Sequence, residues 1–286
     1  MSSANISSKK IKVYDIKRPP NVESYLKSLI QHSQRILKEN LVSVILFGSI
    51  ARNEASITSD VDILLIVRDA NVNTKKLEKI SRLLATKHKL IFIPRGFFGK
   101  LFYALSQATG MFRPVFIARK DDIENWRFQK IFRVSKFMSK ILAPTNAVKY
   151  TISRSYRILY GEDIIKSLNI APPTFKEIIK SLVMNLLLAI SSVVLIPLHK
   201  KTYKFVYEAV KWSLFNYAYA SDKSPSITRL SEIFKNPIRR GMEYFLDTRN
   251  NGKLSPGLLL YSIPAILKIH IASIKRLKVS RKIQSS

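Results

Sequence analysis

The sequence contains no cysteine among its 286 residues. This absence excludes disulfide bonds, zinc–thiolate sites and thiol nucleophiles. A chain without cysteine suits a reducing interior or a thermally stressed one, so we expect a cytoplasmic location. The segment from Met1 to Arg18 also lacks the apolar core of a signal peptide. It is polar and rich in lysine, and it predicts a basic N-terminal arm without an export signal.

Acidic residues are scarce as well. The chain has 19 Asp and Glu residues but 49 Lys and Arg residues, which gives a formal net charge of +30. Such an excess favours polyanionic partners, namely nucleotides, nucleic acid or anionic lipid, but it does not specify a reaction. Internal repeats and low-complexity tracts are absent from the sequence. The length and the 47% content of apolar residues indicate two domains with sizeable cores.

Strands and helices alternate in the first part of the chain. The apolar patterns predict helices over residues 21–40, 74–88 and 97–107, and strands over residues 41–47, 60–67, 90–93 and 114–118. From Asp121 onward the patterns predict helices only, separated by proline and glycine breaks. We therefore expect an α+β fold. Its parts are a basic arm (residues 1–20), a small mixed-sheet domain (21–122), a basic helical connector (123–168) and an all-helical domain (169–286).

Two aspartates open the second of these strands. Side chains alternate along a strand, so Asp60 and Asp62 project from one face with their Cα atoms roughly 6.6 Å apart. Adjacent buried carboxylates repel each other, and the pair is stable mainly when cations occupy it. Mg²⁺ accepts such oxygen ligands together with nucleotide phosphates and water. The pair therefore predicts a Mg²⁺ site.

The preceding strand ends in a turn that suits a nucleotide. Gly48 lets the backbone approach a triphosphate, and the Ser49 hydroxyl and the free amides of the next helix can bind phosphate oxygens. Arg52 would add positive charge beside the same phosphate-binding turn. The alternative is an unrelated turn followed by two solvated aspartates. The Gly48–Ser49 turn and the Asp60–Asp62 pair occur together, in a strand–turn–helix segment followed by a second strand. This combination favours a nucleotide-binding site.

Residues 46–55 (LFGSIARNEA) and 59–67 (SDVDILLIV) resemble the signature of minimal nucleotidyltransferases of the polymerase-β superfamily. The resemblance implies a polymerase-β-type domain that transfers a nucleoside monophosphate from an NTP, with ATP the first expectation, to an unidentified acceptor. Catalysis would use Mg²⁺ on Asp60 and Asp62 and would release pyrophosphate. Asn53 stands where the family has glycine, and asparagine also tolerates a left-handed backbone.

The third carboxylate of that family normally stands on a neighbouring strand, and residues 114–118 (PVFIA) contain none. Asp121 or Asp122 would supply it, or both would be acidic residues that open a helix whose dipole favours them. Glu162, Asp163 and Glu208 are further candidates for the general base, with a surface position as the alternative for each. Without a third carboxylate, the chain would be a catalytically inactive nucleotide- or RNA-binding protein.

Two stretches of the second half carry weaker resemblances. Residues 157–163 resemble a segment that often follows minimal nucleotidyltransferase domains, and residues 209–230 loosely resemble a degenerate HEPN helical domain. HEPN ribonucleases have an arginine followed by four to six residues and a histidine, and the helical half lacks this pair. We therefore expect no nuclease activity.

A basic stripe follows the first domain, with no acidic residue between Glu124 and Glu162. Lys130 and Arg133 belong to this stripe, and cations interleaved with aromatic residues can follow phosphates and stack on bases. We expect these two residues to face a cleft between the two domains and to attract an anionic acceptor such as RNA or a protein. The alternative is a solvated basic face over an aromatic core.

Residues 182–198 are apolar enough to suggest a membrane span, although they are fewer than the usual ~20 residues. Ser181, Asn185 and Ser192 fall on one helical stripe, which is typical of a buried bundle helix with a polar seam. We therefore expect no membrane contact, and a membrane-associated interaction protein is the alternative. The oligomeric state stays unknown from the sequence.

Overall fold

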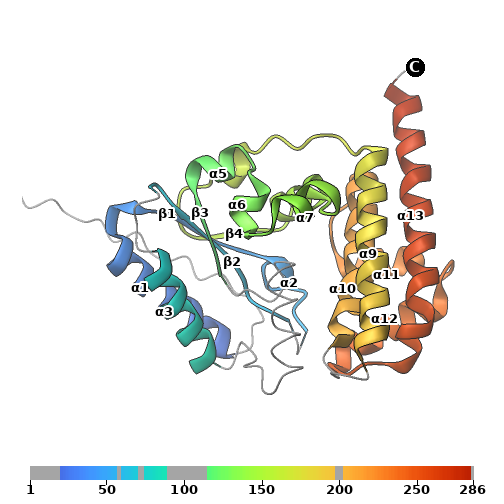
Figure 1. Ribbon diagram of the computed structural model, residues 1–286, viewed down its shortest axis with the longest axis horizontal. Helices are drawn as coiled ribbons and strands as arrows, with labels where there is room; N and C mark the ends of the chain where they lie inside the picture. Colours follow the sequence, from blue (N-terminus) through green and yellow to red (C-terminus); the bar gives the residue numbers. More distant parts are fainter. Residues whose placement is uncertain (1–19, 57–58, 70–73, 89–114, 197–201, 285–286) are drawn as a thin grey trace, which may run out of the picture.

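The computed structural model describes residues 20–56, 59–69, 74–88, 115–196 and 202–284 (Figure 1). The strand expected over residues 90–93 and the helix expected over residues 97–107 lie outside these ranges. The described residues form an α+β fold, with a mixed sheet at one end and a helical bundle at the other (Figure 1). This architecture confirms the predicted fold class.

The sheet has four strands in the order β3-β2-β1-β4. The strands are β1 (Leu41–Phe47), β2 (Asp62–Val67), β3 (Val115–Arg119) and β4 (Arg157–Gly161). Strand β1 is antiparallel to both β2 and β4, whereas β2 and β3 are parallel. The central strands β1 and β2 are buried along nearly their whole length, which explains their continuous apolar sequences.

Helices cover both faces of the sheet. On one face lie α1 (Pro20–Leu37) and α3 (Thr74–Lys87), whose apolar sides pack on Val44, Leu46, Ile63 and Leu65. On the other face lie α5 (Lys120–Glu124), α6 (Phe128–Phe132) and α8 (Thr145–Ser153), and α7 (Lys136–Ile141) follows α6 (Figure 1). Short 3-10 turns occupy Lys38–Asn40 and Ile165–Ser167. Asp62 lies on the second face, because it alternates with Ile63 and Leu65.

Strand β4 corrects the expectation that no strand follows Asp121. It lies in the expected helical connector and pairs with β1 through partners such as Ser43 and Gly161. Its five residues carry no clear period, and their strand form depends on the edge that β1 offers. Gly161 has φ +82°, and a Cβ there would collide with the carbonyl oxygen of Val42. The connector therefore completes the sheet.

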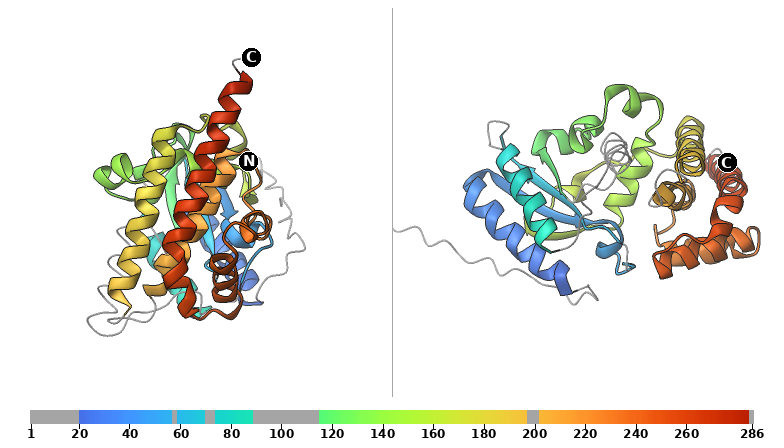
Figure 2. Two further views of the ribbon diagram at one scale, coloured as in Figure 1. Left: turned by 90° about the vertical axis from the view of Figure 1, so that its right-hand side faces the viewer. Right: turned by 60° about the horizontal axis from the view of Figure 1, so that its bottom comes forward.

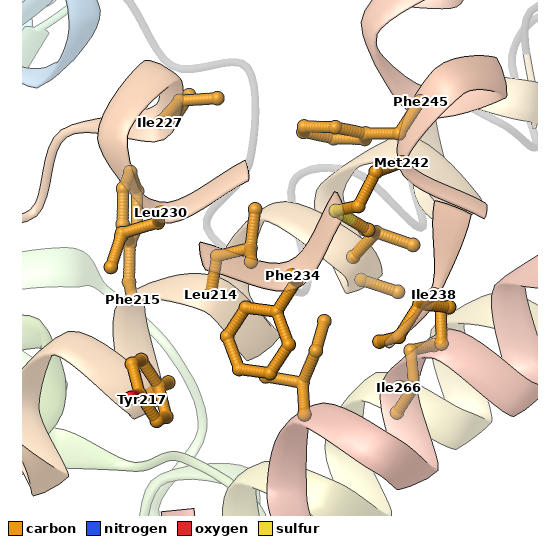
Figure 3. Close-up of a cluster of buried hydrophobic side chains, with 14 of the residues drawn as sticks. Leu214, Phe215, Tyr217, Ile227, Leu230, Phe234, Ile238, Met242, Phe245 and Ile266 are labelled. Atoms are coloured by element: carbon orange, nitrogen blue, oxygen red, sulfur yellow. The ribbon is translucent and has the colours of Figure 1, made fainter. Parts of the chain in front are cut away.

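The bundle is built around α10 (Tyr203–Ala220). Around it pack α9 (Phe175–Leu195), α11 (Ile227–Lys235), α12 (Arg239–Asn251) and α13 (Pro256–Gln284) (Figures 1 and 2). Figure 3 shows the core of the bundle, where Leu214, Phe234, Met242, Phe245 and Ile266 from four helices surround one another. The bundle therefore has its own hydrophobic core, separate from the two beside the sheet.

The predicted polar seam of the bundle is confirmed. Ser181, Asn185 and Ser192 are buried, and the Asn185 side-chain amide donates to Ser213 Oγ at 3.0 Å. His270 is buried, and its Nε2 atom lies 3.3 Å from Ser181 Oγ. It is therefore a packing residue. Helix α9 and the first part of α13 are nonetheless each long and apolar enough to cross a membrane. Their exposed apolar side chains include Val183, Leu187, Ile190, Leu260, Leu267 and Ile271.

Candidate active site

The turn after β1 brings Gly48 against Asp62. Phe47 and Asp62 are register partners in β1 and β2, so the chain leaves β1 directly beside the start of β2. Gly48 has φ +78°, and a Cβ at this position would overlap the Asp62 carboxylate. The short helix α2 (Gly48–Ala51) begins here, and Asn53 adopts φ 59°, as its tolerance of left-handed backbone predicts. Glycine at position 48 is therefore required by both conformation and space.

A cavity of about 240 Å³ lies between the sheet domain and the bundle. Gly48, Ser49, Asp60 and Asp62 line one side of it. Helix α10 lines the opposite side with Tyr203, Lys204, Tyr207, Glu208, Lys211, Trp212 and Phe215. The structure therefore brings the four central residues predicted from the sequence to one cavity, and it adds a second wall from the helical domain.

The two aspartates carry perturbed pKa values. Burial, and next the neighbouring Asp60 carboxylate, raise the pKa of Asp62 to about 7. Burial also raises the pKa of Asp60, although Lys204 lies 3.8 Å from its carboxylate and opposes the shift. Two repelling carboxylates with one cation beside them form a site that a further cation would stabilise.

The donor set fits Mg²⁺ that arrives with a nucleotide. Among the described residues, no group of three or more His, Cys, Asp or Glu side chains could hold a metal ion by itself. Mg²⁺ is usually bound by one or two carboxylates together with substrate phosphates, not by a complete protein cage. Asp60 and Asp62 supply those carboxylates, and the Gly48–Ser49 turn lies where the phosphates would bind.

Replacing Asp62 with asparagine should stabilise the metal-free protein at alkaline pH. Because the folded protein raises this pKa from 3.8 to about 7, the carboxyl group binds its proton more tightly when folded than when unfolded. The free energy of unfolding of the wild type therefore decreases as the pH rises from 3.8 to about 7. Above that range the ionised carboxylate opposes folding. With a discount for water in the cavity, Asp62→Asn should gain about 1–2 kcal/mol at pH 8, or roughly 2–6 °C in Tm.

Thermal melts in EDTA at pH 5 and pH 8 test this expectation. The difference between the variant and the wild type should grow as the pH rises. The exposed Asp247→Asn variant, on α12, is the control and should melt like the wild type at both pH values. A Tm difference for Asp62→Asn that is independent of pH would contradict the proposed electrostatic origin.

Arg52 lies at the cavity, but its guanidinium is engaged by the protein. It donates from Nε to the Glu54 carboxylate at 3.2 Å and lies 4.8 Å from the centre of the Phe215 ring. A third contact joins it to Ser155 Oγ at 3.4 Å. The side chain is only 8% exposed. Arg52, predicted to add charge for phosphates, therefore mainly connects α2 to α10 and to the segment before β4.

Glu54 joins the two domains, which the sequence analysis missed. Its carboxylate accepts hydrogen bonds from the Ser226 hydroxyl and, at 3.0 Å, from the Ile227 amide at the start of α11. Its carbonyl oxygen accepts from the Arg249 guanidinium of α12. A carboxylate at a helix N-terminus satisfies free amides and the helix dipole. The partners lie far apart in the sequence, so no local pattern signals this contact.

The structure does not bring Asp121 or Asp122 to the cavity, contrary to their predicted role as a third carboxylate. Both lie in the first turn of α5, the position that the alternative interpretation gave them. Asp122 accepts from Arg119 Nε at 3.0 Å, and Asp121 pairs with Arg127 at 2.5 Å. These ion pairs with nearby arginines hold both carboxylates away from Asp62.

Lys130 and Arg133 do not line the cavity either, contrary to the expectation that they face the cleft. Lys130 lies 3.6 Å from Asp122, and Arg133 pairs with Glu78 of α3. The aromatic members of the same segment, Phe128 and Phe132, line the cavity instead. The amphipathic pattern of α6 was therefore recognised in the sequence, but its apolar side, not its basic side, faces the site.

Three charged residues of α10 form the wall that the sequence analysis did not assign. Lys204, Glu208 and Lys211 are the charged residues of this otherwise uncharged helix, and their spacing puts them on one helical face. Glu208 was one of three unranked candidates for a base. The other two lie at the surface, where Glu162 pairs with Lys120 and Asp163 accepts from the Tyr156 hydroxyl. Isolated charges at helical spacing in an apolar helix were the available signal.

On β3, an aromatic ring lies on the same sheet face as Asp62. Phe116 is the register partner of Leu64, so it lies on the same sheet face as Asp62. Its ring centre is 6.1 Å from Phe47 and 5.1 Å from Phe132. The lack of a carboxylate on this strand, noted in the sequence, therefore leaves an apolar surface in the cavity.

The mixed sheet, the Gly-Ser turn and the facing aspartates define a nucleotidyltransferase domain of the polymerase-β type with an added helical domain. Residues 26–109 match the family model described as a nucleotidyltransferase domain, so the chain is an enzyme of the nucleotidyltransferase class. Both results confirm the resemblance stated from the sequence. The HEPN resemblance of the bundle stays a prediction.

A solved structure extends the likeness over both domains. The crystal structure of spectinomycin adenyltransferase AAD(9) from Enterococcus faecialis with ATP and spectinomycin superimposes with a TM-score of 0.53. The two sequences are 12% identical, and the match covers 90% of this chain and 99% of that one. No curated protein matches this sequence. The likeness shows that the two proteins share a fold in which a sheet domain is followed by a helical bundle.

Proposed function

We propose that this enzyme transfers a nucleoside monophosphate from an NTP, with ATP the first expectation, to a hydroxyl group of a small acceptor, with release of pyrophosphate. One observation carries the proposal. The Gly48–Ser49 turn and the Asp60–Asp62 pair line the same cavity, opposite a wall supplied by α10. This arrangement combines a phosphate site and a metal site with a surface that can position an acceptor.

Each side of the cavity has a task in this reaction. Ser49 and the amides that follow Gly48 bind phosphate oxygens, and Lys204 adds positive charge from α10. Asp60 and Asp62 would hold Mg²⁺, whose charge would neutralise the phosphates and stabilise the attacking and leaving oxygens. Contacts such as those of Glu54 with α11 keep the two walls together, which limits the access of water.

The acceptor is proposed to be a small molecule with a largely apolar body. The cavity wall made by β3, α6, α8 and α9 includes Phe116, Phe132, Val148, Ile152 and Leu188, and it contributes no acidic or basic side chain to the cavity. The cations expected to attract RNA lie elsewhere. A wall without charged side chains suits a compact ligand that presents a hydroxyl group to the aspartates. The structural neighbour, crystallised with ATP and spectinomycin, supports a small acceptor.

Label transfer tests the proposal. The protein is incubated with each α-labelled NTP, Mg²⁺ and a cell extract separated into small-molecule, RNA and protein fractions. We expect label from ATP in a new species of the small-molecule fraction, with stoichiometric pyrophosphate and no product from the Asp60→Asn, Asp62→Asn double variant. Label in RNA or protein would retain the reaction class but overturn the proposed acceptor.

The same assay addresses an inactive nucleotide-binding protein, the alternative favoured by Phe116 on β3. Wild-type protein that binds Mg²⁺–ATP but labels none of the fractions would support that alternative. Binding is measured by calorimetry, or by quenching of Trp212, which lines the cavity. Failure of both binding and transfer would overturn the nucleotide site itself.

A membrane-associated interaction protein is a separate candidate, favoured by the exposed apolar side chains of α9 and α13. Leu187 and Leu260 are 46% and 77% exposed. Fractionation of cells into soluble and membrane material distinguishes this candidate. Recovery of the chain in the membrane fraction would support it, and recovery in the soluble fraction would leave the small-molecule enzyme as the better account.

A further inference from the structure

We propose that Glu208 of α10 is the general base of the transfer reaction and replaces the carboxylate that β3 lacks. This inference rests on the proposed function. It assigns a catalytic role to a residue of the helical domain, more than 140 positions along the chain from the aspartates. The helical domain would then take part in the chemistry as well as in enclosing the site.

The described cavity residues leave few other candidates. Asp60 and Asp62 are the proposed metal ligands, and Glu54 and Glu208 are the remaining carboxylates among the residues that line the cavity. Both carboxylate oxygens of Glu54 accept hydrogen bonds from the start of α11. Glu208 is therefore the carboxylate that remains for proton transfer.

Its position relative to Asp60 follows from the helix. Lys204 Nζ lies 3.8 Å from Asp60 Oδ1, which places this part of α10 directly over the metal site. Glu208 is one turn further on the same helical face, about 6 Å along the axis. Glu208, Asp60 and Asp62 line the same cavity, so the three carboxylates share one electrostatic environment. An acceptor between α10 and the aspartates would lie within reach of Glu208.

Lys211 holds the carboxylate in place. Its Nζ donates to Glu208 Oε1 at 2.5 Å, and the two side chains are 21% and 14% exposed. Burial acts to lower the pKa of Lys211, but the Glu208 carboxylate raises it above its ordinary value, so the ammonium group stays charged. Within the described part of the chain, Glu208 Oε2 has no hydrogen bond, and it remains available to accept a proton.

The step balances without a further reactant. The acceptor hydroxyl oxygen forms a bond to the α-phosphorus of the NTP as the bond from that phosphorus to the bridging oxygen breaks. Pyrophosphate leaves with that oxygen, and the hydroxyl proton passes to Glu208 Oε2. Lys211 compensates the Glu208 charge before the transfer. General-base catalysis of this kind contributes roughly 10²–10⁴-fold to a rate.

The test compares Glu208→Gln and Glu208→Asp with Glu232→Gln, which amidates an exposed glutamate of α11 outside the cavity. Transfer is measured with α-labelled ATP, Mg²⁺ and the small-molecule fraction of a cell extract, and hydrolysis of ATP to AMP is measured without extract. Affinity for the unreactive analogue α,β-methylene-ATP with Mg²⁺ is measured from the change in tryptophan fluorescence, to which Trp212 in the cavity contributes. Thermal melts establish that each variant is folded.

We expect Glu208→Gln to lower transfer at least about hundredfold while analogue affinity changes less than about threefold. Glu208→Asp keeps the charge beside Lys211 and should recover part of the rate, and Glu232→Gln should match the wild type.

Three results would overturn the assignment. Transfer by Glu208→Gln within about threefold of the wild type would exclude a base at this position, although the proposed function would stand. A parallel fall in transfer and analogue affinity would make Glu208 a ligand of the metal or a partner of Lys211 only. Wild-type protein that binds the analogue but neither transfers nucleotide nor hydrolyses ATP would overturn both proposals.

Discussion

Replacing Asp60 and Asp62 together with asparagine is expected to abolish Mg²⁺-dependent nucleotide binding and transfer. The two carboxylates are the proposed metal ligands on the sheet side of the cavity, and asparagine keeps their size while removing the charge that would hold Mg²⁺. Loss of two charge-assisted interactions of about 1.5–3 kcal/mol each should weaken Mg²⁺–ATP binding by roughly 10²–10⁴-fold.

Calorimetry with Mg²⁺–ATP, and with ATP in EDTA, measures the effect. The double variant should bind ATP equally weakly in both conditions, whereas the wild type should bind tightly only with Mg²⁺. The fold should survive, because the substitutions remove two buried carboxylates that repel each other in the metal-free protein. Asp247→Asn, which changes an exposed aspartate of α12, is the matched control. Equal affinity of the double variant and the wild type in Mg²⁺ would reject the site.

Alanine at position 48 should disable the site through a single methyl group. Gly48 has φ +78°, a conformation that costs other residues roughly 1–2 kcal/mol. The added Cβ would also overlap the Asp62 carboxylate, so either the turn or the aspartate must move. Because the turn and Asp62 are the proposed phosphate and metal ligands, we expect Mg²⁺–ATP affinity to fall by at least about a hundredfold.

Gly161→Ala provides the control for backbone strain. Gly161 has φ +82°, and its added Cβ would collide with Val42 at the sheet edge, far along β1 from the turn. Both variants should melt at lower temperature than the wild type, but Gly161→Ala should retain nucleotide affinity in its folded fraction. Comparable losses of affinity in the two variants would mean that the effect of Gly48→Ala arises from general destabilisation.

Local features of the sequence were enough to predict the sheet side of the site. A strand alternates its side chains, so the spacing of Asp60 and Asp62 placed both on one face before any tertiary contact was known. Gly48 and Ser49 directly follow a strand whose apolar run indicated burial on both faces. These relations involve neighbours in the chain, and the match of residues 26–109 to the nucleotidyltransferase domain agrees with them.

Relations between distant segments could not be predicted in this way. Asp121 and Asp122 were reasonable third carboxylates by proximity in sequence, but Arg119 and Arg127 engage them. Strand β4 forms because β1 offers an edge, and a five-residue apolar segment carries too little periodicity to show that preference.

The sequence by itself therefore determined the class of the enzyme, the Gly48–Ser49 turn and the paired aspartates, because strand alternation and backbone conformation act between neighbouring residues. Only the tertiary structure decided which surface completes the cavity. Glu54 accepts a hydrogen bond from Ser226 across the domains, and Glu208 lies on the face of α10 that lines the cavity opposite Asp60 and Asp62. Such contacts depend on how two separately folded cores pack together, and no pattern within either core contains that information.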